Sequence, residues 1–254
     1  MKVTILGCSG GIGGALRTTA MLVDDDILID GGTGVGDLSL AALSRIDHVF
    51  ITHSHLDHIA CIPLMIDSAA YRRTRPITLY ATAAVLRILR EHIFNWQVWP
   101  DFTQIPDAKT PFMRYQTITV GHTVVLGERR ITPTPAQHTV PAVGYHLDSG
   151  AASLVFTGDT TSQDALWDYL NRIDNLRYLL IETAFSEQQQ DVAIASKHLH
   201  PALLAKELAK LRRPAEIYVT HLKPGEDDVI TKEVEALAAQ FAPRFLHNQQ
   251  VFEF

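Results

Sequence analysis

Short apolar runs alternate with polar turns along the first part of the chain, a pattern typical of β-strands. The runs Val3–Leu6, Thr19–Val23 and Ile27–Asp30 predict three strands, and the acidic turn Asp24–Asp26 predicts a hairpin between the last two. The sequence His48–Thr52 (HVFIT) is a continuous apolar run of the kind found in buried strands. The N-terminal part is therefore expected to be rich in β-structure.

Apolar residues at helical spacing follow this predicted strand. From about His58 to Tyr71 the spacing predicts a helix that begins directly after the end of the strand. A second helix is predicted over Thr82–Ile93, where Leu86 and Leu89 fall on one face and charged residues on the other. This second helix is expected to lie on the surface of the protein.

The second half of the chain repeats the same succession of strands and helices. Strands are predicted at Arg130–Thr134, Val143–Leu147, Ser153–Thr157, Tyr178–Ile181 and Ile217–Thr220. Helices are predicted near Gln163–Asn171, Pro201–Leu211 and Ile230–Phe241. Two β-rich halves, each flanked by helices, predict an α/β fold built as a four-layer αββα sandwich. The halves are similar in pattern but show no detectable sequence repeat.

One segment, residues 94–116, does not fit this succession and is expected to be a loop-rich aromatic insertion. It contains three prolines and the following aromatic residues: Phe94, Trp96, Trp99, Phe102, Phe112 and Tyr115. Two interpretations are open, stacking on the base of a nucleotide or burial against the body or a second subunit. The second is favoured for Trp and Phe in an inserted segment, and it leaves a homodimer open.

Composition and charge narrow the class of protein. The 254 residues are 46% hydrophobic and no Pro/Gly/Ser-rich linker interrupts them, which favours one domain over residues 1–254. The formal charge of −6 and the lack of a Lys/Arg run disfavour long nucleic acid as a partner. Two cysteines and an N-terminal apolar run too short for a signal peptide indicate a reduced, cytoplasmic protein. No apolar stretch approaches the roughly 18 residues of a membrane span.

A dense group of histidines follows the predicted strand His48–Thr52. Alternate residues leaving a strand point to one side, so His53 and His55 are expected to converge on one metal ion. Asp57 and His58 turn into the helix and are expected to face a neighbouring ion. Further candidate ligands follow predicted strands elsewhere in the chain: His138, Asp159 and His221.

The order of these residues resembles that of the metallo-β-lactamase superfamily. It is His-x-His-x-Asp-His, then a single His, then Gly-Asp after a strand, and then a strand-terminal His. The resemblance runs from Leu6 to His221 and implies the fold of that superfamily. It also implies a pair of divalent metal ions with these ligands: His53, His55 and His138 on one, Asp57, His58 and His221 on the other, and Asp159 bridging. Zinc is the default metal, and manganese and iron suit the same ligands. Asp30 is expected to hydrogen-bond a ligand imidazole.

Further segments resemble class II cyclic-nucleotide phosphodiesterases and the related tRNA 3′-end-processing endonucleases. They are Leu6–Ile12, Arg17–Thr19, Leu28–Gly34, Ile181–Phe185 and His198–Pro201. The resemblance makes His198 the proton donor to the leaving ribose oxygen and Glu182 the carboxylate that orients it. Asp57 counts as catalytic as well as a ligand. His200 competes with His198 for the donor role, and is otherwise expected to lie beside the site or to face solvent.

The glycine-rich segment Gly7–Gly14 matches other motifs only in part. It lacks the spacing of the dinucleotide fingerprint and the Lys of a P-loop. It contains the Gly-x-Ser-x-Gly pattern of serine hydrolases, but Gly13 and Gly14 oppose the helix that this motif needs. Two interpretations stay open, a rim loop whose Ser9 and backbone N–H groups hold a phosphate oxygen, or a simple tight turn.

Together these patterns predict a binuclear metallo-hydrolase. Its expected substrate is a cyclic nucleotide such as cyclic AMP or cyclic GMP, or a similar small phosphodiester, attacked by a metal-bound hydroxide. The alternatives are a tRNA 3′-processing-type endonuclease, a thioester or lactone hydrolase of the same fold, and a non-catalytic metal-dependent binding module. The nuclease is disfavoured because the chain shows no basic arm for tRNA.

Overall fold

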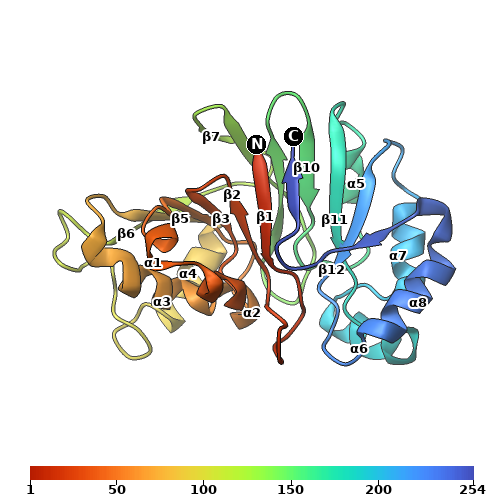
Figure 1. The fold of residues 1–254 in the computed structure, drawn as a ribbon, viewed down its shortest axis with the longest axis horizontal. Coiled ribbons are helices and arrows are strands. Elements are labelled where there is room, and N and C mark those ends of the chain that lie inside the picture. Colours follow the sequence, from red (N-terminus) through yellow and green to blue (C-terminus); the bar gives the residue numbers. More distant parts are fainter.

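Two seven-stranded sheets lie face to face in the computed structural model, which describes residues 1–254 (Figure 1). The first sheet has these strands in spatial order: β14 (Val251–Glu253), β1 (Lys2–Gly7), β2 (Ala20–Val23), β3 (Ile27–Ile29), β4 (His48–Phe50), β5 (Ile77–Ala81) and β6 (Met113–Thr117). The second has these: β13 (Arg244–Phe245), β12 (Glu216–Thr220), β11 (Leu176–Glu182), β10 (Ser153–Phe156), β9 (Val143–Asp148), β8 (Arg129–Pro135) and β7 (Val124–Leu126).

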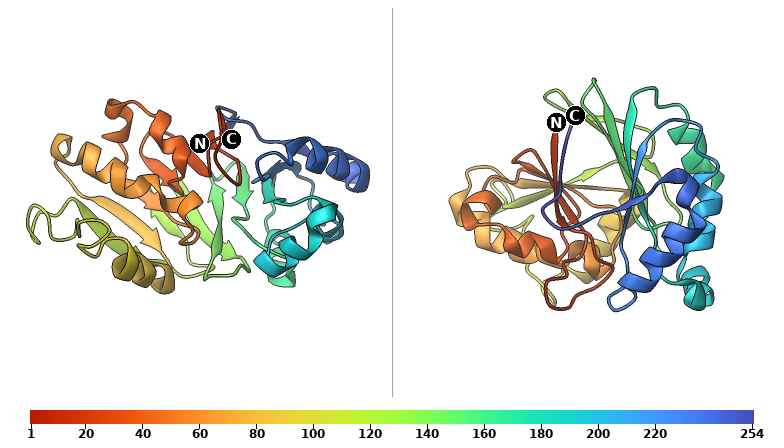
Figure 2. Two further views of the ribbon diagram at one scale, coloured as in Figure 1. Left: turned by 90° about the horizontal axis from the view of Figure 1, so that it is seen from below. Right: turned by 45° about the vertical axis from the view of Figure 1, so that its right-hand side comes forward.

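Helices cover the outer face of each sheet. Beside the first sheet lie α1 (Leu40–Leu43), α2 (Leu56–Ile59), α3 (Cys61–Ala69) and α4 (Ala83–His92). Beside the second lie α5 (Asp164–Leu170), α6 (Gln190–Ser196), α7 (Pro201–Leu208) and α8 (Asp227–Leu237). Figure 2 shows the two helical groups on opposite sides of the central sheets. The predicted four-layer αββα sandwich is confirmed.

The two sheets share one pattern of strand directions. Three antiparallel pairings run from β14 to β3, and three parallel pairings continue to β6. The second sheet repeats this order, antiparallel from β7 to β10 and parallel from β10 to β13. The similarity between the halves therefore lies in their strand topology, although their sequences show no repeat.

Alternation of side chains along the strands divides the core into three layers. In β3, Ile27 and Ile29 face the second sheet, whereas Leu28 faces the helices α3 and α4. Because successive residues of a strand point to opposite faces, a strand covered on both sides is apolar throughout, as Ile27–Ile29 is. A third cluster packs the second sheet against its own helices and includes Trp167 of α5.

The helix predicted over Thr82–Ile93 is observed as α4. Thr82 is its N-cap, and the Thr82 hydroxyl accepts a hydrogen bond from the backbone N–H of Val85 at 3.4 Å. Val85, Leu86 and Leu89 are buried against the sheet, so the predicted apolar face is the one that packs. None of the helices in the structure has both the length and the apolar character needed to cross a membrane.

The chain between α4 and β6 forms neither helix nor strand until Met113, where β6 begins within the segment 94–116. Phe94 and Phe102 from this segment are buried in the cluster beneath the first sheet's helices, with 3% and 2% of their surface exposed. Trp96 is 62% exposed. At least these two Phe side chains therefore pack against the body of the same chain.

Candidate metal centre

The His-rich motif lies in the turn between β4 and α2. The strand ends at Phe50, two residues before the expected end at Thr52, and α2 begins at Leu56 with His55 as its N-cap. Asp57 and His58 lie in the first turn of this short helix. The motif therefore lies just beyond the carboxyl end of β4, and layered α/β folds place their sites at the carboxyl ends of strands.

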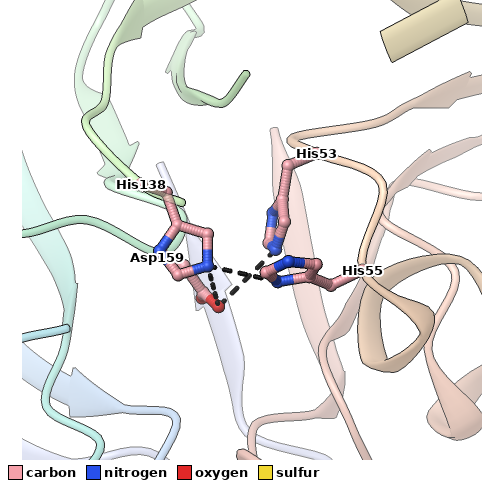
Figure 3. Close-up of side chains that lie close together, drawn as sticks. All are labelled: His53, His55, His138 and Asp159. Atoms are coloured by element: carbon pink, nitrogen blue, oxygen red, sulfur yellow. Dashed lines mark hydrogen bonds and ion pairs between the residues drawn. The ribbon is translucent and has the colours of Figure 1, made fainter. Parts of the chain in front are cut away.

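Seven side chains gather there into two groups, in each of which one donor atom per residue lies within 4.8 Å of the others. The first group is His53, His55, His138 and Asp159 (Figure 3). The second group is Asp57, His58, Asp159 and His221. The structure thus brings together all seven side chains that the sequence put forward as ligands, with Asp159 common to both groups. Their role as ligands stays a prediction.

One oxygen atom, Oδ2 of Asp159, is the centre of the arrangement. It lies 3.3 Å from Nε2 of His58 and 3.3 Å from Nε2 of His221. It also lies 3.7 Å from Nε2 of His53 and 4.0 Å from Nε2 of His138. A single carboxylate oxygen therefore faces imidazoles of both groups.

Several donor atoms of these groups are buried without a hydrogen-bond partner. They are His53 Nε2, His58 Nε2, His221 Nε2 and Asp159 Oδ1. Leaving a buried polar atom unpaired costs about 1–3 kcal/mol, so three unpaired imidazole nitrogens around Oδ2 of Asp159 indicate a missing partner. Imidazole nitrogen and carboxylate oxygen are the donors that divalent metal ions take, so the residues present fit metal ions at this place.

Asp30 holds one of the imidazoles in place. Its Oδ2 accepts a hydrogen bond from Nδ1 of His58 at 2.7 Å and another from the Thr52 hydroxyl at 2.8 Å, and its Oδ1 accepts one from the Thr52 backbone N–H at 2.8 Å. Asp30 is fully buried and has a positive φ of 60°. This contact directs Nε2 of His58 towards Asp159.

Other polar contacts to the imidazoles were not predicted from the sequence. The Lys197 carbonyl oxygen accepts from Nδ1 of His138 at 3.1 Å. The Thr52 hydroxyl lies 3.0 Å from Nδ1 of His53, and the Thr19 hydroxyl lies 3.4 Å from Nδ1 of His221. Thr52 directly precedes the motif, and that adjacency was the one signal in the sequence for these partners.

Burial keeps most of these imidazoles neutral. It lowers the pKa of His138 to about 4 and that of His221 to about 3, although the nearby Asp159 carboxylate opposes the change. Burial likewise lowers the pKa of His53 well below its ordinary value. His58 is the exception: burial lowers its pKa, but the carboxylates of Asp159 and Asp30 together raise it well above the ordinary value. Neutral imidazoles have the free lone pair that a metal ion needs.

His198 and Glu182 form a buried pair beside both groups. Glu182 ends β11, and its Oε1 accepts a hydrogen bond from Nδ1 of His198 at 2.8 Å. The Glu182 carboxylate also accepts from the backbone N–H groups of Thr160 and Leu199, at 3.0 and 3.2 Å. The His198 ring lies 4.8 Å from the His138 ring and 5.3 Å from the His221 ring between centroids.

The pair is arranged so that the imidazole takes up a proton readily. Burial lowers the pKa of His198, but the carboxylates of Glu182 and Asp159 raise it more, against an opposing effect of the Lys223 ammonium, so the net pKa is raised. Burial raises the pKa of Glu182, and the contact with His198 reduces that increase. A protonated His198 is a suitable general acid near neutral pH.

The two remaining candidates lie at the margin. Nδ1 of His200 donates to Oε1 of Glu187 at 2.7 Å, and His200 is the N-cap residue of α7, so its ring is held away from the two groups by this partner. Ser9 is 7% exposed, and its hydroxyl donates to the Leu222 carbonyl oxygen at 3.4 Å. No helix follows Ser9, as predicted from Gly13 and Gly14.

Comparisons with known proteins identify the family of this chain. The sequence profile of the family described as "Beta-lactamase superfamily domain" matches residues 26–222. A protein of Yersinia pestis described as a probable 3′,5′-cyclic-nucleotide phosphodiesterase is 26% identical over 275 residues, covering 88% of this chain and 78% of that protein.

Solved structures show the same fold. Unliganded yeast PDE1 superposes with a TM-score of 0.80 at 19% identity, covering 98% of each chain. The short form of human tRNase Z superposes with a TM-score of 0.69 at 18% identity, covering 100% of this chain and 99% of that one. At these identities the likeness extends to the fold alone.

Proposed function

The chain belongs to the β-lactamase superfamily, and from that premise we propose that it is a phosphodiesterase acting on a cyclic nucleotide or a similar small phosphodiester. Its membership and its relatives, among them a probable metallo-hydrolase of Bacillus subtilis, make it a hydrolase. The observation that carries the substrate class is the buried pair of His198 and Glu182 beside two ligand groups. A ribose oxygen is a poor leaving group and needs a proton, whereas activated substrates do not.

We propose that two divalent ions, zinc by default, occupy the two groups. The first would be held by His53, His55 and His138, the second by Asp57, His58 and His221, and both by Asp159. Bound divalent ions would polarise a phosphoryl oxygen and make water more acidic. The unpaired nitrogens of His53, His58 and His221 support this assignment, because each gains a partner.

The chain's own residues supply the proton and the orientation. Nδ1 of His198 is engaged by Glu182, which leaves Nε2 to donate a proton to the leaving oxygen. Glu182 holds the ring in that orientation and stabilises its protonated form. Asp57 has 25% of its side chain exposed, whereas Asp159 is buried, so we assign Asp57 the contact with the attacking water.

Charge favours a small substrate over a long polyanion. The formal net charge is −6, and binding of long nucleic acid depends on many Lys and Arg contacts to phosphates. A cyclic nucleotide presents one phosphate, which one site can hold. This argument favours the phosphodiesterase over the tRNA-processing function, although human tRNase Z shares the fold.

The test is the hydrolysis of bis(p-nitrophenyl) phosphate, cyclic AMP and cyclic GMP, before and after chelation and with Zn²⁺ or Mn²⁺ restored. We expect turnover of a cyclic nucleotide that chelation abolishes and the metal restores. Turnover of the aryl diester alone would support the diesterase chemistry and contradict the cyclic-nucleotide assignment.

Further substrates separate the alternatives. Cleavage of a precursor tRNA at its 3′ trailer, without activity on cyclic nucleotides, would assign the nuclease function. Metal-dependent activity on a thioester or lactone alone would contradict the phosphodiesterase. Binding of a cyclic nucleotide without any turnover would identify a binding module.

A further inference from the structure

A lysine that the sequence argument did not single out lies next to the candidate general acid. Lys223 follows the strand-terminal His221 by two residues, and its backbone N–H donates to the Ala184 carbonyl oxygen at 3.1 Å. Its ammonium donates to the Gly10 carbonyl oxygen at 2.7 Å. The same Nζ lies 5.8 Å from the ring centroid of Phe185. The side chain is therefore held by one hydrogen bond on one side and an aromatic ring on the other.

Both neighbours of this ammonium contact imidazoles of the site. The Phe185 ring lies 5.7 Å from the His198 ring between centroids. Gly10 lies directly on His221: a Cβ at Gly10 would stand 2.5 Å from the His221 carbonyl oxygen and 3.1 Å from its Cδ2. Because a side chain at Gly10 has no room there, the glycine loop packs closely on His221 and brings its carbonyl oxygen to Lys223. The ammonium thus contacts two residues, Phe185 and Gly10, that in turn lie against His198 and His221.

The ammonium retains capacity to bind an anion. It has three N–H donors, and one of them donates to the Gly10 carbonyl oxygen. Lys223 is half-buried, so the ammonium is partly shielded from water, and an interaction with an anion is stronger than on an open surface. Asp57 and Asp159 belong to the proposed ligand groups, where divalent ions would neutralise their charge, so Lys223 would add a further positive charge for an anionic substrate.

We propose that the Lys223 ammonium binds a non-bridging oxygen of the substrate's phosphate group, beside the His198 proton donor. The residue would place the phosphate so that its leaving oxygen meets His198, and it would select anionic substrates over neutral ones. This inference rests on the proposed phosphodiesterase function for its substrate class, and on the structure for its geometry. The ammonium contributes a charge-assisted hydrogen bond, which is about twice as strong as a neutral one.

Two other assignments compete with this one. Lys223 could serve only to hold the glycine loop through Gly10, a role that needs a hydrogen-bond donor but no charge. Lys197 is a second lysine near the site, and its Nζ donates to the His138 carbonyl oxygen at 3.1 Å. The experiment therefore separates charge from hydrogen bonding and Lys223 from Lys197.

The experiment is a calorimetric titration of the metal-loaded protein with inorganic phosphate at fixed ionic strength. Lys223→Gln keeps a side-chain N–H donor and removes the charge. We expect it to raise Kd for phosphate by about 10-fold to 100-fold, the range for a hydrogen bond to a charged group. Lys223→Arg keeps the charge and should bind within about threefold of the wild type, because both cations bind phosphate. Lys232→Gln, at an exposed position on α8, makes the same change in net charge and should bind as the wild type does.

Three results would overturn the proposal. They are wild-type affinity in Lys223→Gln, no binding of phosphate by the wild type, and a weakening caused by Lys197→Gln but not by Lys223→Gln. Metal content and circular dichroism of each variant show that the site and the fold are intact. The second readout is KM against kcat on bis(p-nitrophenyl) phosphate, where Lys223→Gln should raise KM more than it lowers kcat. If the wild type hydrolyses no phosphodiester, the proposed function fails while the titration still decides the role of Lys223.

Discussion

At the scale of single residues, the orientation of an imidazole decides what it can bind. His58 is fully buried, its Nδ1 is taken by Asp30, and its Nε2 is thereby aimed at Asp159. Replacing Asp30 by Asn removes the charge from nearly the same shape, so we expect metal affinity to fall by about 10-fold to 100-fold. Competition with a chromophoric chelator measures that affinity. Asp174→Asn, at a side chain 87% exposed, is the matched control, and equal affinity of the two variants would refute the role of Asp30.

The proton donor can be separated from the metal ligands by one substitution. His198→Ala should leave metal content unchanged, because His198 belongs to neither ligand group. It should lower kcat on a cyclic nucleotide by about 10²-fold to 10⁴-fold, the usual contribution of a general acid. A p-nitrophenolate leaving group needs no proton, so bis(p-nitrophenyl) phosphate should be less affected. Equal losses on both substrates would argue that His198 only packs, and an unchanged rate would transfer the role to His200.

The sequence predicted the residues of the site better than the groups that hydrogen-bond to them. Four of the candidate ligands stand within six residues of one another, so their proximity follows from local chain geometry. His138, Asp159 and His221 were found because each follows a predicted strand. The Lys197 carbonyl oxygen and the Gly10 carbonyl oxygen carry no residue-type signal, since every residue has such a group. Contacts of that kind become visible only in the folded chain.

At the scale of elements, the strongly patterned ones were predicted and the weakly patterned ones were missed. The hairpin of β2 and β3 and the helix α4 were predicted from their sequences. The helix α6 was missed because it exposes Val192 and Ile194 and buries Ala193, the reverse of an amphipathic pattern.

Two helices over the second sheet are joined by one buried carboxylate. Glu207 of α7 is 2% exposed and accepts hydrogen bonds from Trp167 Nε1 and the Ser162 hydroxyl, each at 2.6 Å. Lys210 Nζ lies 2.7 Å from the same carboxylate. Glu207→Gln should therefore lower the free energy of unfolding by about 1.5–3 kcal/mol at neutral pH, the range for hydrogen bonds to a charged group. Urea denaturation measures this, with Glu235→Gln on the exposed face of α8 as control.

The Glu207 carboxylate also makes the free energy of unfolding depend on pH. Burial raises the pKa of Glu207, but the hydrogen bonds from Lys210, Ser162 and Trp167 lower it more, so the folded-state pKa lies below the ordinary value. A lowered pKa means that the stabilisation is complete above the unfolded-state pKa of about 4.3 and is lost as pH falls through the folded-state pKa. The difference in free energy of unfolding between wild type and Glu207→Gln should therefore become smaller below about pH 4. A difference that grows on acidification would contradict this sign.

At the scale of the whole molecule, the candidate metal centre joins the two halves of the sandwich. The segment from His53 to His58 follows β4 of the first sheet, whereas Asp159 follows β10 and His221 follows β12 of the second. An ion that binds His53 and Asp159 together thus connects the two sheets at one edge. The apolar cluster between the sheets, which contains Phe50 and Tyr145, connects them independently of any ion. The metal-free protein is therefore expected to stay folded, but with lower stability.

Removing the metal should lower the melting temperature by an amount that mass action sets. A ligand bound only by the folded state adds about 2.7 kcal/mol at a free concentration of 100 times its Kd, and for a chain of this size each kcal/mol corresponds to about 2–4 °C. Scanning calorimetry with and without a chelator should show a fall of several degrees that added Zn²⁺ reverses. Asp159→Ala removes the carboxylate common to both groups, so its melting temperature should not respond to chelation. A wild type that loses its metal without any change in Tm would show that the ions do not hold the halves together, and the interface between the sheets would then carry that stability alone.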